Sequence, residues 1–257
     1  MEKTELQSAL TLPQFPMSAK YDPEWICQNQ MGPCSLWLCE FLMEKMALKP
    51  GMRVLDMGCG KGMTSIFLAK EYGVTVFAND LWISATDNFK RFQDTGLEDM
   101  ITPIHAEAHK LPYADEFFDA VISIDSYQYY GTDALYLDYI SRFLKTGGQI
   151  GIVVPALTRE FDDGGAPDYM LPHWDWSMYS FHSPQWWSRL WRFSQSIEVE
   201  ISDLLPNGFD IWLRWEEIGK LTFNSDRNGD LELLKADRGN YLTFGRTVGR
   251  KVMKRWR

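Results

Sequence analysis

The sequence predicts an α/β protein with a Rossmann-like, doubly wound sheet of seven strands, and three observations support this fold. A short apolar run at 53–57, typical of a buried strand, leads into the glycine-rich run 58–62. A helical pattern follows at 63–72, and strand-like and helix-like segments then alternate to residue 154. Such alternation predicts parallel strands covered by helices on both faces, with ligands bound at the carboxyl ends of the strands.

Local signals place the individual elements. Residues 1–20, which carry two prolines, are expected to form a mobile leader. An amphipathic helix is expected over 33–47, because Pro33 suits the first turn of a helix and the Lys-Pro-Gly run 49–51 stops it. The helix after the glycine-rich run ends at Gly73, a residue type that favours C-terminal caps. The later elements expected from periodicity are strand 74–78, helix 82–95, strand 100–105, a short helix or turn at 114–117, strand 119–124, helix 133–145, strand 149–154, strand 197–201, helix 209–222 and strand 241–248.

Composition fits a soluble enzyme. Hydrophobic residues make up 45% of the 257, enough for a sizeable core. No apolar run approaches the roughly 20 residues of a transmembrane helix, and the N-terminus lacks the apolar core of a signal peptide. The cysteines form no C-x-x-C pair, which favours reduced thiols and a cytoplasmic location. They are Cys27, Cys34, Cys39 and Cys59.

Charge is unevenly distributed along the chain. The net charge of −9 disfavours nucleic acid as a partner of the body of the protein. The last stretch, Arg246 to Arg257, is basic instead. It is interpreted as a solvated terminus, and contact with anionic lipid or nucleic acid is the alternative.

The glycine-rich run indicates the kind of ligand. Its alternate glycines allow the backbone to approach a ligand closely, but Asp56 would repel a pyrophosphate and suits a ligand with an ammonium group. Met63 stands where the dinucleotide fingerprint places its third glycine. Asp80, about twenty positions after the run, lies where an acid at a strand end accepts hydrogen bonds from ribose hydroxyls. The pattern therefore favours a nucleoside that carries an ammonium group over a dinucleotide.

These features resemble the class I S-adenosylmethionine-dependent methyltransferases. The motifs that carry the resemblance occur in the family's order over roughly residues 30–155. They are Asp56–Gly62, Asp80, the Leu-Pro-aromatic turn within 106–113, the strand within 118–125 and the turn at 144–148. The resemblance implies a mostly parallel sheet with an antiparallel last strand.

The resemblance also implies the cofactor, S-adenosyl-L-methionine, and its product, S-adenosyl-L-homocysteine. The glycine turn at 29–33 opens a helix whose N-terminus could receive the methionine carboxylate. An upstream tyrosine, Tyr21, matches one that covers the cofactor in similar enzymes; an ordinary helix cap behind a disordered leader is the alternative. The expected cofactor-binding residues are Tyr21, Met31, Gly32, Asp56, Gly58, Cys59, Gly60, Asp80, Leu81, Glu107, Ala108 and Asp125.

An aromatic-rich insert at 156–195 separates the fifth and sixth strands. Its position at the carboxyl end of the sheet suits a lid that excludes water and aligns a substrate, and aromatic faces attract cationic amines. Rings that merely fill the core of a helical cap are the alternative. The expected substrate-contacting residues are Tyr127, Trp174, Trp176 and His182.

Methyl transfer needs little catalytic chemistry beyond alignment and removal of a proton where the nucleophile carries one. Asp125, Tyr130 and His173 are the candidate catalytic residues, and no single base is identified. His105 and His109 are four residues apart, but prolines bracket them and no third ligand follows, so no metal site is expected.

The predicted function is transfer of a methyl group to a small-molecule N, O, S or C nucleophile by in-line displacement, through proximity and desolvation. A methyltransferase that acts on lipid or nucleic acid, or a binding protein without catalysis, are the alternatives; a homo-oligomer stays open. The expected regions are a leader and cofactor-covering segment at 1–32, a cofactor-binding core at 33–155, the lid at 156–195 and the end of the sheet with its basic tail at 196–257.

Overall fold

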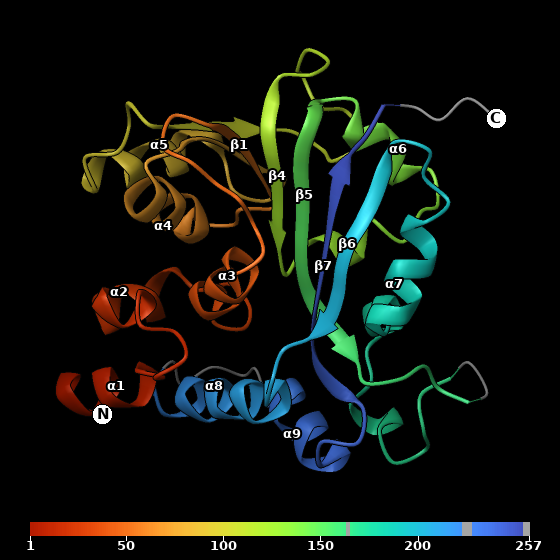
Figure 1. Ribbon diagram of the computed structural model, residues 1–257. Helices are drawn as coiled ribbons and strands as arrows, with labels where there is room; N and C mark the ends of the chain where they lie inside the picture. Colours follow the sequence, from red (N-terminus) through yellow and green to blue (C-terminus); the bar gives the residue numbers. More distant parts are fainter. Residues whose placement is uncertain (163–164, 223–227, 254–257) are drawn as a thin grey trace.

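The computed structural model describes residues 1–162, 165–222 and 228–253. These residues form one sheet of seven strands in the order β3-β2-β1-β4-β5-β7-β6 (Figure 1). Strand β7 runs antiparallel to both of its neighbours, and the other pairs are parallel. The predicted fold is thereby confirmed. The strands are β1 Arg53–Met57, β2 Thr75–Asp80, β3 Ile101–His105, β4 Phe118–Ile124, β5 Leu144–Leu157, β6 Ile197–Leu204 and β7 Leu242–Lys251.

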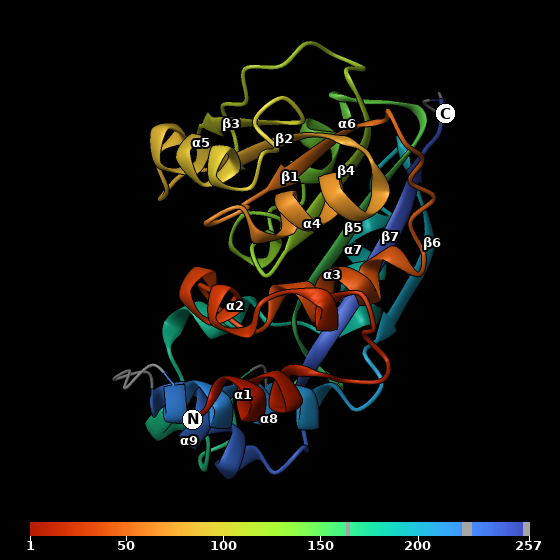
Figure 2. The ribbon, with the colours of Figure 1, turned by 90° about the vertical axis from the view of Figure 1, so that its left-hand side faces the viewer.

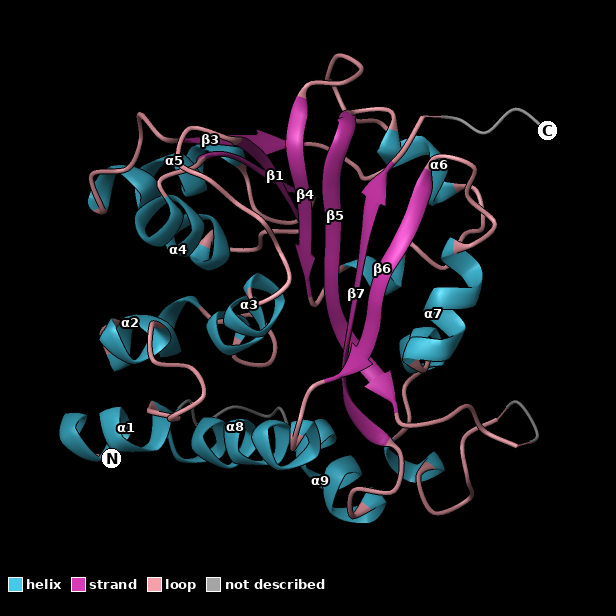
Figure 3. Cartoon of the chain, viewed as in Figure 1, coloured by secondary structure: helices cyan, strands magenta, loops and turns pink. Residues whose placement is uncertain are grey.

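Helices cover both faces of the sheet, and a further layer of helices lies on the side toward which β4 and β5 point (Figures 2 and 3). That layer contains α1, α8 and α9. The α-helices are α1 Lys3–Leu10, α2 Pro23–Asn29, α3 Ser35–Met43, α4 Met63–Tyr72, α5 Ala85–Asp94, α6 Tyr136–Ser141, α7 Pro184–Trp191, α8 Gly208–Thr222 and α9 Asn228–Asp237. Short 3-10 helices are η1 Ser18–Lys20, η2 Tyr127–Tyr129, η3 Leu171–His173 and η4 Trp176–Ser180.

The central strands are apolar on both faces, as expected for a sheet covered on both sides. Ile122 and Val153 pack into the cluster on the α3 and α4 side, whereas Val121 and Ile152 pack into the cluster on the α6 and α7 side. This alternation reflects the two-residue period of a strand.

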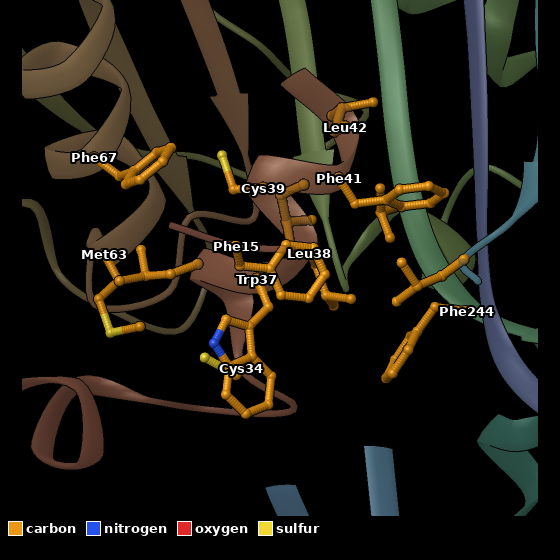
Figure 4. Packing of buried hydrophobic residues seen from close by; sticks show 14 of the residues in the cluster. Phe15, Cys34, Trp37, Leu38, Cys39, Phe41, Leu42, Met63, Phe67 and Phe244 are labelled. Carbon is orange, nitrogen blue, oxygen red and sulfur yellow. The ribbon is translucent and has the colours of Figure 1, made fainter. Parts of the chain in front are cut away.

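Helix α3 lies at the centre of the larger cluster (Figure 4). Trp37, Leu38 and Cys39 are buried although they point to different sides of the helix. Phe67 of α4 lies on one side of α3, and Phe244 of β7 lies on the other. The helix therefore ties the glycine-rich half of the sheet to its antiparallel end.

The expectation of a mobile leader is wrong for residues 3–10, which form α1. Leu6 and Leu10 are buried in the larger cluster together with Phe15. The indole N–H of Trp37 donates to the Leu10 carbonyl at 3.2 Å, and Arg214 Nε donates to the Ala9 carbonyl at 2.8 Å. The leader is therefore fixed to α3 and α8, contacts that local sequence signals do not reveal.

The ends of other strands and helices differ from the expected ones where contacts between distant segments determine them. Strand β5 is longer than expected because it pairs with β7 from Gln149↔Arg250 to Leu157↔Leu242. Helix α6 is shorter than the segment expected at 133–145. Helix α9 was not expected; its start follows the segment 223–227, which lies outside the described residues.

The basic residues near the C-terminus have partners where the structure describes them. The Arg246 guanidinium is 2% exposed and forms two bonds to the Asp203 carboxylate, at 2.9 and 2.7 Å. Arg250 pairs with Glu200, and Lys251 donates to the Leu144 carbonyl at 2.6 Å. These three side chains therefore belong to strand β7, which lies between β5 and the edge strand β6. Lys254, Arg255 and Arg257 of the expected basic tail lie outside the described residues.

Candidate active site

The glycine-rich run forms a tight loop between β1 and α4. Gly58, Gly60 and Gly62 all have positive φ, of 69°, 54° and 77°. The N–H groups of Gly58 and Cys59 donate to the Asn79 carbonyl at 2.8 and 3.1 Å. Only glycine adopts three such conformations at low cost, so the sequence determines the shape of this loop.

Asp80 joins the loop to the end of β2. Its Oδ2 accepts the Gly60 N–H at 2.8 Å, and its Oδ1 accepts the N–H groups of Trp82 and Ile83 at 2.7 and 2.9 Å. A carboxylate offers about four acceptor sites, so acceptor capacity remains for a ligand hydroxyl. These three bonds fix the carboxylate at the edge of the loop.

Asp56 lies behind the loop. It is 1% exposed, and its Oδ2 accepts the hydroxyls of Thr64 and Ser65, both at 2.6 Å. Burial raises the pKa of Asp56 to about 6, although the bonds from Ser65 and Thr64 lower it. Asp56 does not line the cavity described below, so in the structure it supports the start of α4 from behind.

The buried Asp56 predicts a measurable pH dependence. Because its pKa is raised on folding, its contribution to stability is fully present below about pH 4 and is lost as the pH rises through about 6. The loss is on the order of 2–3 kcal/mol. Asp56→Asn keeps an oxygen that can accept the hydroxyls of Thr64 and Ser65. We therefore expect the difference in unfolding free energy, Asp56→Asn minus wild type, to become more positive as the pH rises through this range.

Urea unfolding of both proteins at a series of pH values measures this difference. The contributions of other titrating groups cancel between the two proteins. A constant difference from about pH 4 to about pH 7 would show that the Asp56 carboxyl titrates normally.

The segment that enters α3 crosses the loop. Lys61 Nζ donates to the Gln28 carbonyl at 2.8 Å. A Cβ atom on Gly60 would lie 2.9 Å from the Met31 sulfur, and a Cβ on Gly32 would lie 2.2 Å from Asp125 Oδ2. The segment thus packs directly on the loop and on the end of β4.

A cavity of about 340 Å³ opens at the carboxyl ends of β1, β2 and β4, where the order of the strands reverses. It brings together most of the residues expected from the sequence. They are Met31, Gly32, Gly58, Cys59, Gly60, Asp80, Leu81, Glu107, Ala108, Asp125 and Tyr130.

Tyr21, expected to cover the cofactor, does not line this cavity. Its ring packs against Trp25 and Phe67, with centroids 5.6 and 5.7 Å away. Its hydroxyl lies 3.2 Å from a Glu71 carboxylate oxygen, to which it donates. The structure therefore places the Tyr21 ring between α2 and α4, outside the lining of the cavity.

Asp125 and Tyr130 lie at the end of the cavity that β4 forms. Asp125 has a φ of 52°, a left-handed conformation that is strained for most residues other than glycine. Gln128 Nε2 donates to Asp125 Oδ1 at 3.2 Å. The Tyr130 hydroxyl lies 3.0 and 3.2 Å from those of Ser123 and Ser126. Burial raises the pKa of Tyr130, so the phenol keeps its proton at neutral pH.

The other expected catalytic and substrate residues do not line this cavity. Tyr127 is 2% exposed and packs between Tyr136 and the tryptophans of α7. His182 stacks on Trp186 with ring centroids 3.6 Å apart. Its Nδ1 lies 2.9 Å from a Glu160 carboxylate oxygen, and Glu160 and Trp186 line a separate cavity.

The expected site residues of the aromatic insert also lie away from the cavity, in different surroundings. Trp174 packs against Phe161 and Tyr179, whereas Trp176 is 82% exposed. His173 ends η3, which lies against α9. The sequence shows that this segment is rich in aromatic residues but does not show which way the three side chains point. A 3-10 helix is too short to display a hydrophobic period from which their orientation could be predicted.

Sequence reasoning gave no role to several residues that line the cavity. Asn79 is 2% exposed, and its Oδ1 has no hydrogen-bond partner among the described residues. Trp82 also lines the cavity. Asn79 and Trp82 lie within two residues of Asp80. Their position at the end of the same strand was the sequence signal that could have identified them as site residues.

Comparison with known proteins agrees with this geometry. The family described as "Methyltransferase domain" matches residues 55–152. Methyltransferase GfsG of Streptomyces halstedii is 31% identical over 127 residues, which are 49% of this chain and 46% of that protein. The chain thus spans about half the length of that relative.

Two further relatives extend over more of the chain. The uncharacterized methyltransferase YodH of Bacillus subtilis is 30% identical over 182 residues, which are 69% of this chain and 74% of that protein. The crystal structure of a putative sarcosine dimethylglycine methyltransferase from Galdieria sulphuraria has 20% identity and a TM-score of 0.70, covering 86% of this chain and 87% of that one. The motifs, the sheet order and the extent of the match to YodH together show that this chain belongs to the class I S-adenosylmethionine-dependent methyltransferases.

Proposed function

We propose that this chain transfers a methyl group from S-adenosylmethionine to a small-molecule nucleophile bound in the cavity at the ends of β1, β2 and β4. The observation that carries the proposal is the closed glycine loop bonded to Asp80 beside that cavity. A volume of about 340 Å³ suits a nucleoside-sized ligand with a small neighbour better than a polymer.

The residues present fit the cofactor. Asp80 would accept hydrogen bonds from the ribose hydroxyls. A Cβ on Gly58 or Gly60 would fill the space over the loop, within 3 Å of Ser126 or Met31. The buried Asn79 Oδ1 has no donor in the part of the chain that the structure describes, and a ligand N–H or O–H would supply one. Met31 and Gly32 would cover the methionine part, and Leu81, Glu107 and Ala108 the adenine.

The bound cofactor supplies an activated methyl group on a sulfonium, so the chain's task is alignment and exclusion of water. Asp125 and Tyr130 stand at the acceptor end of the cavity. The Tyr130 hydroxyl, held by Ser123 and Ser126, would position an acceptor rather than remove its proton. We therefore assign catalysis to proximity and desolvation.

We further propose that the regions divide this work. Residues 1–32 brace and cover the cofactor, 33–155 bind it, 156–195 close the acceptor side, and 196–257 complete the sheet. No helix among the described residues combines the length and apolar character needed to cross a bilayer. The four cysteines are free and buried, which supports a cytoplasmic location.

The test is a product search. Incubation with S-adenosylmethionine and a metabolite extract should yield S-adenosylhomocysteine together with an equal amount of a metabolite heavier by one methylene. Mass spectrometry of the mixture measures both. Binding of S-adenosylhomocysteine without any methylated metabolite would favour a binding protein without catalysis. Methylation confined to added RNA or lipid would favour the other alternative.

A further inference from the structure

A second cavity, of about 330 Å³, opens beside the carboxyl end of β5 and the start of α7 (Figure 1). Residues 158–160, which follow β5, form one side of it, and Ser183 and α7 form the other. None of its lining residues lines the cavity at the ends of β1, β2 and β4. The two cavities are therefore distinct.

Glu160 joins the two sides of this second cavity. One of its carboxylate oxygens accepts the N–H and the hydroxyl of Ser183, at 2.7 and 2.6 Å, and the other lies 2.9 Å from His182 Nδ1. Although partial burial raises the pKa of Glu160, the bonds from Ser183 and His182 lower it overall. The negative charge of Glu160 is therefore taken up by donors within the wall of the cavity.

The indole of Trp186 gives the cavity a flat apolar surface. His182 stacks on this indole with ring centroids 3.6 Å apart and planes 6° apart, and Trp187 meets it edge to face at 5.0 Å. Trp186 lines the cavity and His182 does not, so the part of the indole that the histidine leaves uncovered borders the cavity. Because these neighbours already hold the indole in place, a ligand that packs on it loses little affinity to ordering.

Two arginines, Arg159 and Arg189, line the same cavity. Arg159 stacks on the Tyr241 ring at 4.5 Å and pairs with Asp162 at 3.3 Å. The two side chains of that pair are 57% and 83% exposed, and pairs so exposed contribute little free energy. Arg189 has no hydrogen-bond or ion-pair partner within the described part of the chain. In a protein of net charge −9, this cavity therefore offers two guanidinium groups that a ligand anion can reach.

We propose that this second cavity binds a small organic phosphate. A phosphate monoester carries about 1.5 to 2 negative charges at pH 7, which match the guanidinium groups of Arg159 and Arg189. Gln185 lies one helical turn before Arg189 and would add an amide donor. A flat apolar part of the ligand would pack on Trp186. This site is independent of the proposed methyl transfer.

Three probes test both parts of the site. Phenyl phosphate carries a ring and the anion, whereas phenol and inorganic phosphate each carry one of them. Each is titrated by calorimetry into the full-length protein in a phosphate-free buffer, with and without saturating S-adenosylhomocysteine. We expect phenyl phosphate to bind at least about tenfold more tightly than phenol and at least about threefold more tightly than inorganic phosphate. The nucleoside should leave these affinities unchanged.

Variants separate the residues. Arg189 is exposed and has no partner among the described residues, so the fold should survive Arg189→Gln. We expect this variant to weaken phenyl phosphate binding about tenfold or more, and Trp186→Leu to weaken it about threefold to tenfold. Arg192→Gln removes the same charge from an exposed position at the end of α7, outside the cavity lining. It is the matched control and should bind phenyl phosphate as the wild type does.

Four results would overturn the proposal. Phenyl phosphate that fails to bind, or binds no better than phenol, would show that the arginines form no phosphate site. Equal affinity for phenyl phosphate and inorganic phosphate would remove Trp186 from the site. Loss of binding on saturation with S-adenosylhomocysteine would place the probe in the cofactor cavity. Equal losses in Arg189→Gln and Arg192→Gln would indicate general attraction by positive charge in place of a defined site.

Discussion

Replacing Asp80 with alanine should weaken cofactor binding by roughly 1–3 kcal/mol, or about fivefold to 150-fold in the dissociation constant. Two losses add to this effect. The ribose would lose a charged acceptor, and the N–H groups of Gly60, Trp82 and Ile83 would lose the carboxylate that now fixes them. Calorimetric titration with S-adenosylhomocysteine measures the change.

Two further variants make the Asp80 result specific. Asp94→Ala removes an exposed carboxylate of α5 that does not line the cavity, and it should bind as the wild type does. Asp80→Asn keeps one oxygen acceptor and should fall between the wild type and Asp80→Ala. Wild-type affinity in Asp80→Ala, with an unchanged melting temperature, would remove Asp80 from the site.

The cofactor half of the site was predictable because its chemistry is local in sequence. Three glycines with positive φ dictate the loop, and Asp80 closes it from the next strand in the same βαβ unit. Helix α4 has the predicted bounds, 63–72, because both flanking glycines, Gly62 and Gly73, take the left-handed conformation that glycine favours.

The acceptor half depends on contacts between segments that are far apart in the chain. Helix η4 lies against η2, which contains Tyr129, and no periodicity in either segment indicates that meeting. The tryptophans of α7 were read as a lid or a core, and the structure buries Trp187 and Trp191 in the core behind the sheet. Apolar composition is common to both outcomes, so only packing could decide between them.

The same reasoning explains the leader. Its prolines suggested mobility, but Leu6, Leu10 and Phe15 are buried in the same cluster as α3, a helix that is itself buried along nearly its whole length. An apolar face shows that a segment is buried without showing where. Tyr21 does not line the cavity for the same reason, because its ring packs against Phe67 of α4.

Gly58→Ala should be the most damaging single-methyl change in the cofactor loop. A side chain at a φ of 69° costs about 1–2 kcal/mol. The added Cβ would also lie 1.9 Å from Ser126 Oγ and 2.4 Å from Ser126 Cβ, so the end of β4 beside Asp125 must move. Overpacking adds about 1–3 kcal/mol. We expect the unfolding free energy to fall by roughly 2–5 kcal/mol and cofactor affinity to fall with it.

Gly96 supplies a matched control for the conformational cost. Its φ is 67°, almost that of Gly58, and a Cβ there would meet nothing within 4 Å. Gly96→Ala should therefore show the backbone cost alone, about 1–2 kcal/mol, with unchanged cofactor affinity. Ser126→Gly removes the atoms that collide, so the double variant with Gly58→Ala should recover the overpacking component but not the backbone cost. If Gly58→Ala and Gly96→Ala cost the same in urea unfolding, the loop has room at Gly58, and the close approach between this loop and the end of β4 is not what shapes the cofactor site.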